Sequence, residues 1–274
     1  MTAPRVLHTD AEVLAHKRAG SLHVVTLVAP GVAELHRPGT FAELTLGGPD
    51  SDRLARHAFW ILRTRPSGTY GSTIELLVAE RDPGTRWLVQ TAPGTAVPLT
   101  APLGRPFALP REAVTCTLVA HEDGVAAVLG LAGRLKERGC VVHVVLGAAS
   151  DARLYGALDL RRTARTVQVV TADGSVGRRG ELAEVLPAVL DEQRPEVVYA
   201  AGPVPLLRAT AAEAEARGAW SQVAYAGAMP CGVGHCLGCL VPVVGEDAVA
   251  RNVRACTEGP VFRGDRVRWD EVTS

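Results

Sequence analysis

The 274-residue chain has no excess charge of either sign, because 29 lysine and arginine residues balance 29 acidic residues. Without net charge, electrostatic attraction to nucleic acid or to an anionic membrane is excluded as a default function. The chain also lacks an apolar run near the roughly 20 residues that a membrane-spanning helix needs. Its first residues lack the apolar stretch of a signal peptide. We therefore expect a cytoplasmic protein that binds neither nucleic acid nor a membrane.

Cysteine is infrequent too, yet four of the six cysteines form one pattern near the end of the chain. Cys231, Cys236 and Cys239 make a C-x4-C-x2-C array, and Cys256 follows after sixteen intervening residues. This is the ligand spacing of a plant-type 2Fe-2S cluster. Glycines between the cysteines let the backbone wrap round inorganic sulfide and point N–H groups at it. The array predicts a metal site formed by these four thiolates.

A zinc site is the main alternative, since four cysteines also bind zinc. Paired C-x2-C steps are common in zinc sites, and this chain has only one, so the spacing favours the iron-sulfur cluster. His235 lies inside the array, and we interpret it as a solvent-facing or hydrogen-bonding residue rather than a ligand. Cys116 and Cys140 fall in apolar runs and are expected to be buried thiols that behave as small hydrophobes.

From about residue 11 to residue 106 the pattern is all-β, with short apolar runs separated by Gly and Pro turns such as 37–39 and 82–84. The pattern predicts a small barrel. A linker is expected at 107–111. The predicted strands are 12–17, 22–28, 41–46 and 72–78.

Beyond the linker, strands and helices alternate, which predicts a parallel sheet wrapped by helices. Such sheets bind ligands at the carboxyl ends of their strands, so the loops after Ala120 and Ala201 are candidate sites. The expected strands are 115–120, 140–146, 166–171, 196–201 and 222–226, and the expected helices are 125–138, 181–192 and 205–217.

Several motifs carry a resemblance to a known family. They are the cysteine array, the closing phrase from Cys256 to Phe262, and the barrel motifs at 37–41, 84–88 and 101–107. With them, the chain resembles the electron-transfer subunits of type B dihydroorotate dehydrogenase, a branch of the ferredoxin-reductase-like flavoproteins. The resemblance implies a six-stranded flavin-binding barrel over 1–107, a doubly wound nucleotide-binding α/β domain over 108–226, and a 2Fe-2S cluster tail over 227–274.

The resemblance also implies an FAD site in the barrel. Gly84 and Thr85 match the family's flavin-diphosphate loop, where backbone N–H groups and a hydroxyl can face phosphate oxygens, although an ordinary turn is the alternative. Arg56 lies where the family has a flavin-binding arginine, and the planar guanidinium group of arginine can bind a diphosphate through two parallel hydrogen bonds. The alternative interpretation is that Arg56 is an ordinary exposed arginine. The family's proline and serine are replaced nearby, and Phe59 and Trp60 could stack on the flavin or belong to the barrel core.

The nicotinamide site departs furthest from the family pattern. Family members that oxidise NADH have a Gly-Gly-Gly-x-Gly-x-Ala-Pro turn, because glycine lets the backbone approach a pyrophosphate. Here Gly124 and Ala126 remain, but Glu122 and Asp123 place negative charge there. Gly202 and Pro203 belong to a second motif that persists over 201–207. We expect direct NAD(P)H oxidation to be weak or lost.

The family carries electrons from dihydroorotate, through an FMN in a separate catalytic subunit and the 2Fe-2S cluster, to FAD and then NAD+, in pyrimidine biosynthesis. No residue needs to act as a general acid or base, because the cofactors carry the redox chemistry. Leu237, Leu240 and Val241 could form the contact surface for the partner or pack in the core. Three alternatives stay open: a flavin-free iron-sulfur relay or redox sensor, a zinc-stabilised binding protein, and a reductase that serves another partner.

Overall fold

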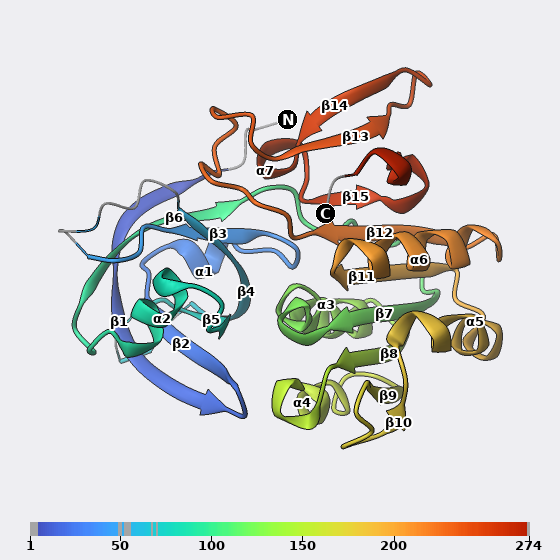
Figure 1. The fold of residues 1–274 in the computed structure, drawn as a ribbon, viewed down its shortest axis with the longest axis horizontal. Coiled ribbons are helices and arrows are strands. Elements are labelled where there is room, and N and C mark those ends of the chain that lie inside the picture. Colours follow the sequence, from blue (N-terminus) through green and yellow to red (C-terminus); the bar gives the residue numbers. More distant parts are fainter. Residues whose placement is uncertain (1–4, 49–50, 52–55, 67, 70, 273–274) are drawn as a thin grey trace.

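A closed antiparallel barrel and a mainly parallel α/β sheet lie side by side in the computed structural model (Figure 1). The structure describes residues 5–48, 51, 56–66, 68–69 and 71–272. The C-terminal residues form a third layer along the edge where these two parts meet (Figure 1). This is the predicted fold class, a barrel followed by an α/β domain and a C-terminal tail.

The barrel closes in the order β1-β2-β5-β4-β3-β6. Its interior is filled by side chains that alternate inward along the strands, such as Val25 and Leu27 on β2. Sequence patterns predicted four of the six strands and missed β4 and β6. The strands are β1 (Leu7–Ala19), β2 (Leu22–Val28), β3 (Phe41–Leu44), β4 (His57–Arg65), β5 (Thr73–Ala79) and β6 (Ala96–Leu103), with helices α1 (Val32–Leu35) and α2 (Pro83–Gln90) between them.

The α/β sheet has the order β10-β9-β8-β7-β11-β12-β15, and its strand order reverses between β7 and β11. All five predicted strands and all three predicted helices are present within a few residues of their expected ends. The strands are β7 (Thr115–His121), β8 (Val141–Ala148), β9 (Thr166–Thr171), β10 (Arg178–Arg179), β11 (Val197–Gly202), β12 (Trp220–Tyr225) and β15 (Val261–Arg263). The helices are α3 (Val125–Glu137), α4 (Ala157–Leu160), α5 (Leu182–Gln193) and α6 (Val204–Glu215), with short 3-10 turns η1 (Glu122–Gly124) and η2 (Asp151–Arg153).

Helix α3 lies between the sheet and the barrel, and α5 and α6 cover the opposite face (Figure 1). One apolar cluster joins barrel residues such as Leu62 and Leu77 to α3 residues such as Leu131. A core shared in this way fixes the barrel against the sheet, so that the loops at their junction keep a defined geometry.

The C-terminal segment contacts both of the larger parts. Its strand β15 pairs antiparallel with β12 and extends the α/β sheet. At the barrel, the N–H of Arg56 donates to the carbonyl oxygen of Pro230 at 3.2 Å, and the N–H of Arg105 donates to that of Gly259. The remaining elements are β13 (Leu240–Val244), β14 (Ala250–Arg254), α7 (Ala255–Glu258), η3 (Gly264–Arg266) and η4 (Trp269–Glu271).

Across the ranges that the structure describes, no helix combines the length and the apolar character needed to cross a membrane.

Candidate functional site

The four cysteines of the array form two pairs of thiols. Cys239 and Cys256 are buried, with sulfur atoms 3.3 Å apart. Cys231 and Cys236 are less buried and are hydrogen-bonded to each other. Within the described residues, no three His, Cys, Asp or Glu side chains gather as ligands of one metal ion. Two pairs suit a 2Fe-2S cluster, in which each of the two irons takes two protein ligands.

Backbone N–H groups surround the outer pair of sulfur atoms. Burial by itself raises the pKa of the Cys231 thiol, but N–H groups of Cys236, Val233 and His235 donate to its sulfur and lower that pKa to about 6. The N–H of Gly238 donates to the sulfur of Cys236 at 3.4 Å. Donors placed in this way stabilise negatively charged sulfur, which is the form that binds metal. The His235 side chain is exposed, as predicted.

The inner pair has a different environment. Burial raises the pKa of the Cys256 thiol, and the neighbouring Cys239 raises it further, while an N–H group of Gly234 opposes the shift. The N–H of Ala255 donates to the carbonyl oxygen of Cys239 at 2.8 Å and ties the two sequence segments together. A metal that binds these thiols must displace their protons, which couples metal loading to pH.

Glu43 of β3 lies directly beneath the cysteine loop. Its side chain is 1% exposed, and neither carboxylate oxygen accepts a hydrogen bond from the described residues. Burial raises the pKa of this carboxyl to about 8, against the opposing effect of Arg56. A side chain at Gly232, which has a φ of 65°, would meet Glu43. The loop therefore rests on the barrel at a point where only glycine fits.

Arg56 stands beside Glu43 and directly precedes β4. Its guanidinium donates to the Thr100 hydroxyl at 3.3 Å, and its backbone N–H holds Pro230 at the start of the cysteine loop. The predicted flavin-diphosphate arginine therefore lies under the cysteine loop, whereas its neighbour His57 lies against the N-terminus of α2.

A cleft of about 640 Å³ opens where the barrel, the α/β sheet and the cysteine loop meet. This volume lies within the range of ligand pockets. The cleft contains three predicted site residues, Gly124, Gly202 and Pro203, at the carboxyl ends of neighbouring strands. Its walls are formed by Trp60, Arg81, His121, Glu122, Asp123, Gly124, Gly202, Pro203, Val204, Pro205, Tyr225, Ala226, Gly227, Ala228, Gly238 and Leu240.

Two ion pairs occupy the acidic end of this cleft. Glu122 has a φ of 49°, and its carboxylate pairs with Arg153 at 2.7 Å and accepts from the N–H of Ala149 at 3.3 Å. Asp123 pairs at 2.7 Å with Arg81, which follows the barrel strand β5. The second pair bridges the barrel and the α/β domain. Both carboxylates that the sequence placed at the dinucleotide turn are therefore held by arginines of the same chain.

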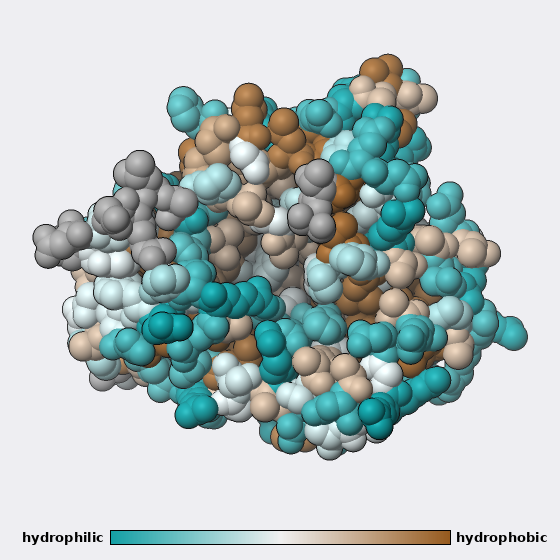
Figure 2. Space-filling model, viewed as in Figure 1, coloured by the Kyte–Doolittle hydropathy of each residue, from teal (hydrophilic) through white to brown (hydrophobic). Residues whose placement is uncertain are grey.

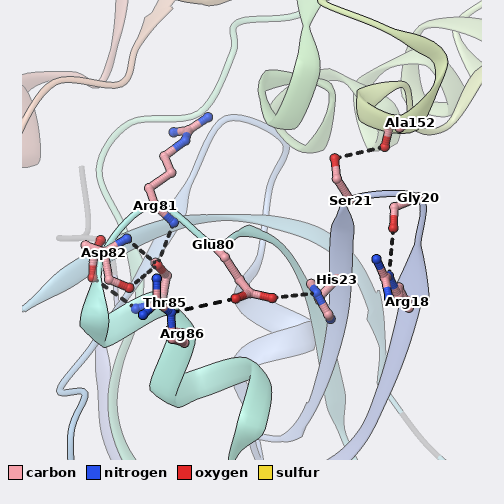
Figure 3. Close-up of polar contacts among 10 residues, drawn as sticks. All are labelled: Arg18, Gly20, Ser21, His23, Glu80, Arg81, Asp82, Thr85, Arg86 and Ala152. Carbon is pink, nitrogen blue, oxygen red and sulfur yellow. Dashed lines mark hydrogen bonds and ion pairs between the residues drawn. The ribbon is translucent and has the colours of Figure 1, made fainter.

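The N-terminus of α2 is closed by its own side chains (Figure 3). The Asp82 carboxylate accepts from the N–H group of Gly84 at 2.7 Å. It also accepts from the N–H group of Thr85 at 3.0 Å. The Thr85 hydroxyl accepts from the N–H groups of Arg81 and Asp82, both at 3.0 Å, and donates to the Asp82 carbonyl oxygen. The prediction of a turn at 82–84 is wrong, because Asp82 caps a helix that starts at Pro83.

Aromatic side chains separate the cleft from the barrel interior. Trp60 packs edge-on against Phe41, with ring centroids 6.5 Å apart, and faces the cleft. Phe59 packs against the barrel core and stacks on His57. Of the two predicted stacking residues, only Trp60 is exposed to the cleft.

Apolar side chains are exposed around the cysteine loop. Val233, Leu237 and Leu240 expose 52, 57 and 42% of their surface. Apolar colour gathers over this part of the molecule in Figure 2. Val241 is buried, so its role is core packing. Apolar residues that are exposed together on a protein surface are typical of a contact surface for a partner.

Comparison with known proteins supplies relatives for the tail and for the whole chain. The model for the iron-sulfur cluster binding domain of dihydroorotate dehydrogenase B matches residues 227–268. The dihydroorotate dehydrogenase B (NAD(+)) electron transfer subunit of Desulforamulus reducens is 31% identical over 265 residues, with 95% of this chain and 98% of the relative covered. The subunit of Geobacillus thermodenitrificans is 31% identical over 89% of this chain and 91% of its own.

Solved structures share the fold. An NADH-dependent reduced ferredoxin-NADP oxidoreductase, described in connection with flavin-based electron bifurcation, superimposes with a TM-score of 0.82 at 25% identity, over 96% of this chain and 91% of its own. A ferredoxin NADP+ reductase of Neisseria gonorrhoeae with bound FAD and NADP gives a TM-score of 0.60 at 16% identity, over 78% of this chain and 92% of its own.

Proposed function

This chain belongs to the family of dihydroorotate dehydrogenase B electron-transfer subunits, and we propose the pathway that its electrons follow. It is an oxidoreductase subunit that transfers electrons by means of a 2Fe-2S cluster and FAD. In our proposal, electrons leave dihydroorotate in an FMN-containing catalytic subunit, pass through the cluster of this chain, and reach FAD and then NAD+ or another acceptor. The observation that carries the proposal is the two-pair arrangement of thiols beside a cleft.

Cys231, Cys236, Cys239 and Cys256 are the proposed cluster ligands. The outer pair would hold one iron and the inner pair the other. The N–H groups that reach the sulfur atoms of Cys231 and Cys236 set how readily the bound group accepts an electron, because hydrogen bonds to sulfur stabilise its negative charge. No residue of this chain is assigned a catalytic acid or base role.

The cleft is the proposed location of the flavin ring. Trp60 and Tyr225 provide aromatic surface there, and Gly238 of the cysteine loop reaches the same space. A flavin exchanges two electrons and a 2Fe-2S cluster one, so the two groups together join hydride chemistry to single-electron transfer. The residues of the cleft position the ring and limit its contact with water.

The proposed division of the chain is 1–107 for the flavin-binding barrel, 108–226 for the nucleotide-binding-like α/β domain and 227–274 for the cluster tail. Residues 1 and 274 lie outside the described residues. The pairing of β15 with β12 means that the tail and the α/β domain share a sheet, so the tail is expected to depend on its neighbour for stability.

The proposed partner surface is the exposed apolar group formed by Val233, Leu237 and Leu240. A catalytic subunit that covers it would bury apolar area and bring its own flavin close to the cluster ligands. The resulting assembly is a hetero-oligomer of the two subunits.

An anaerobic titration with dihydroorotate tests this function. With the catalytic subunit present, the visible absorbance of the cluster should bleach on adding dihydroorotate; with this chain alone it should not. Cluster absorbance that stays unchanged in the mixture, while dithionite still bleaches it, would contradict the proposed electron pathway.

Direct oxidation of NADH by this chain is expected to be slow. Support comes from Glu122 and Asp123, whose carboxylates hold Arg153 and Arg81 in ion pairs and so keep both guanidinium groups from a pyrophosphate. The Asp123→Asn change removes one negative charge and releases Arg81 from its ion pair. We therefore expect NADH to bind roughly tenfold tighter, a gain in binding free energy of about 1.4 kcal/mol.

Stopped-flow reduction of the flavin-loaded protein over a range of NADH concentrations measures both the rate of flavin reduction and the affinity for NADH. Asp191→Asn is the matched control, because Asp191 also pairs with an arginine but lies on α5, away from the cleft. Wild-type protein reduced at an ordinary enzyme rate, within the range of about 1 to 1,000 s⁻¹, would contradict the expectation.

A further inference from the structure

At the N-terminus of α2, Gly84 and Thr85 were expected to donate hydrogen bonds to a diphosphate. Their donors are already bonded to other groups of the described chain. The N–H groups of Gly84 and Thr85 both donate to Asp82 Oδ1. The Thr85 hydroxyl is engaged as acceptor and as donor at once. Pro83, at the first helical position, has no N–H to offer. An incoming phosphate would have to replace these bonds.

The group that occupies this terminus is itself negatively charged. Burial opposes ionisation of Asp82, but the N–H groups of Thr85 and Gly84, together with His57, hold the pKa of its carboxyl below its ordinary value. A diphosphate and this carboxylate would compete for the same positive end of the helix and repel each other.

His57 locks Asp82 in place from the barrel side. Its Nε2 lies 3.1 Å from Asp82 Oδ1. Its ring also presses on Gly84, where an added Cβ would come within 2.8 Å of the imidazole. The imidazole ring therefore lies directly beside the helix terminus and narrows the space that a phosphate group could enter.

The nearby arginines are directed elsewhere. Arg81 points away from the helix terminus in Figure 3 and pairs with Asp123. Arg86 faces Glu80, with 4.0 Å between Nε and Oε2. Arg56 lies under the cysteine loop. Each of these three guanidinium groups has a partner other than a ligand at this terminus.

We propose that Asp82, held by His57, is a built-in competitor for the diphosphate of FAD. In the resting chain the carboxylate fills the diphosphate position, and FAD binds fully only when the carboxylate leaves the helix terminus. The chain therefore takes up FAD weakly and exchangeably. This inference rests on the proposed function, because it concerns the flavin that the subunit carries.

The Asp82→Ser change separates charge from helix capping. Serine caps a helix about as well as aspartate does, so α2 should be retained while the negative charge is lost. The FAD dissociation constant, measured by quenching of flavin fluorescence on the purified full chain, should fall at least tenfold. Riboflavin, which lacks the diphosphate, should bind both proteins equally.

Asp173→Ser is the control for loss of one acidic charge, because Asp173 caps an exposed turn after β9. It should leave both dissociation constants unchanged. An FAD affinity that is equal in wild type and Asp82→Ser, with riboflavin binding intact, overturns this inference alone. If neither protein binds FAD or riboflavin, the inference fails together with the flavin part of the proposed function, whereas the iron content still tests the cluster.

Discussion

A Cys256→Ser chain should purify with its iron content reduced from about two atoms per chain to a small fraction of one. Cys256 is 1% exposed and 3.3 Å from the sulfur of Cys239, so it belongs to the inner thiol pair. Serine has nearly the same size but offers a hard oxygen in place of the soft thiolate that iron-sulfur clusters select. The visible absorbance should fall in proportion to the iron.

Cys140→Ser is the matched control. Cys140 is also buried, but it precedes β8 in the α/β domain, far along the chain from the array. Its replacement should leave iron and sulfide unchanged. Full iron in Cys256→Ser, or equal losses in both variants, would remove Cys256 from the ligand set.

Replacing Gly232 with alanine should weaken both the fold and the cluster. The left-handed φ of 65° costs about 1–2 kcal/mol for a residue with a Cβ. The new methyl group would also collide with Glu43 in a packed interface, which adds about 1–3 kcal/mol. We expect the free energy of unfolding to fall by about 2–5 kcal/mol in total, and iron to be lost faster on dilution into a chelator.

Gly218→Ala supplies the comparison, because Gly218 has a similar φ of 69° with nothing within 4 Å of an added Cβ. It should show only the backbone cost of about 1–2 kcal/mol and should retain its iron. Denaturant unfolding monitored by fluorescence and by cluster absorbance measures both effects. Equal destabilisation of the two variants would mean that the loop does not rest on Glu43.

The sequence was most informative where the pattern is local. The cysteine spacing and the alternation of strands and helices are properties of short windows, and the predicted strand 166–171 coincides with β9. Strand β6 was missed because Pro98 and Pro102 argue against a strand. Helix α2 was missed because Asp82, Pro83 and Gly84 favour a turn as strongly as they favour a helix start.

The candidate site was less predictable, because its contacts join distant parts of the chain. The pairing of Asp123 with Arg81 spans 42 positions, and no window that contains one residue indicates the other. His57 was not predicted as a site residue, yet it is the residue that holds Asp82. Glu43 gave a weak signal, a single acidic residue in an otherwise apolar strand whose four residues are all buried.

We propose that this chain holds a 2Fe-2S cluster at its four C-terminal cysteines, in a flavin-binding fold. Anaerobic absorption spectroscopy with iron, sulfide, zinc and flavin quantitation on the purified chain tests it most directly. We expect about two irons and two sulfides per chain. FAD should be present in a substoichiometric amount that increases when FAD is added. Zinc without iron and sulfide would contradict it, because the thiol pairs would then hold a different metal.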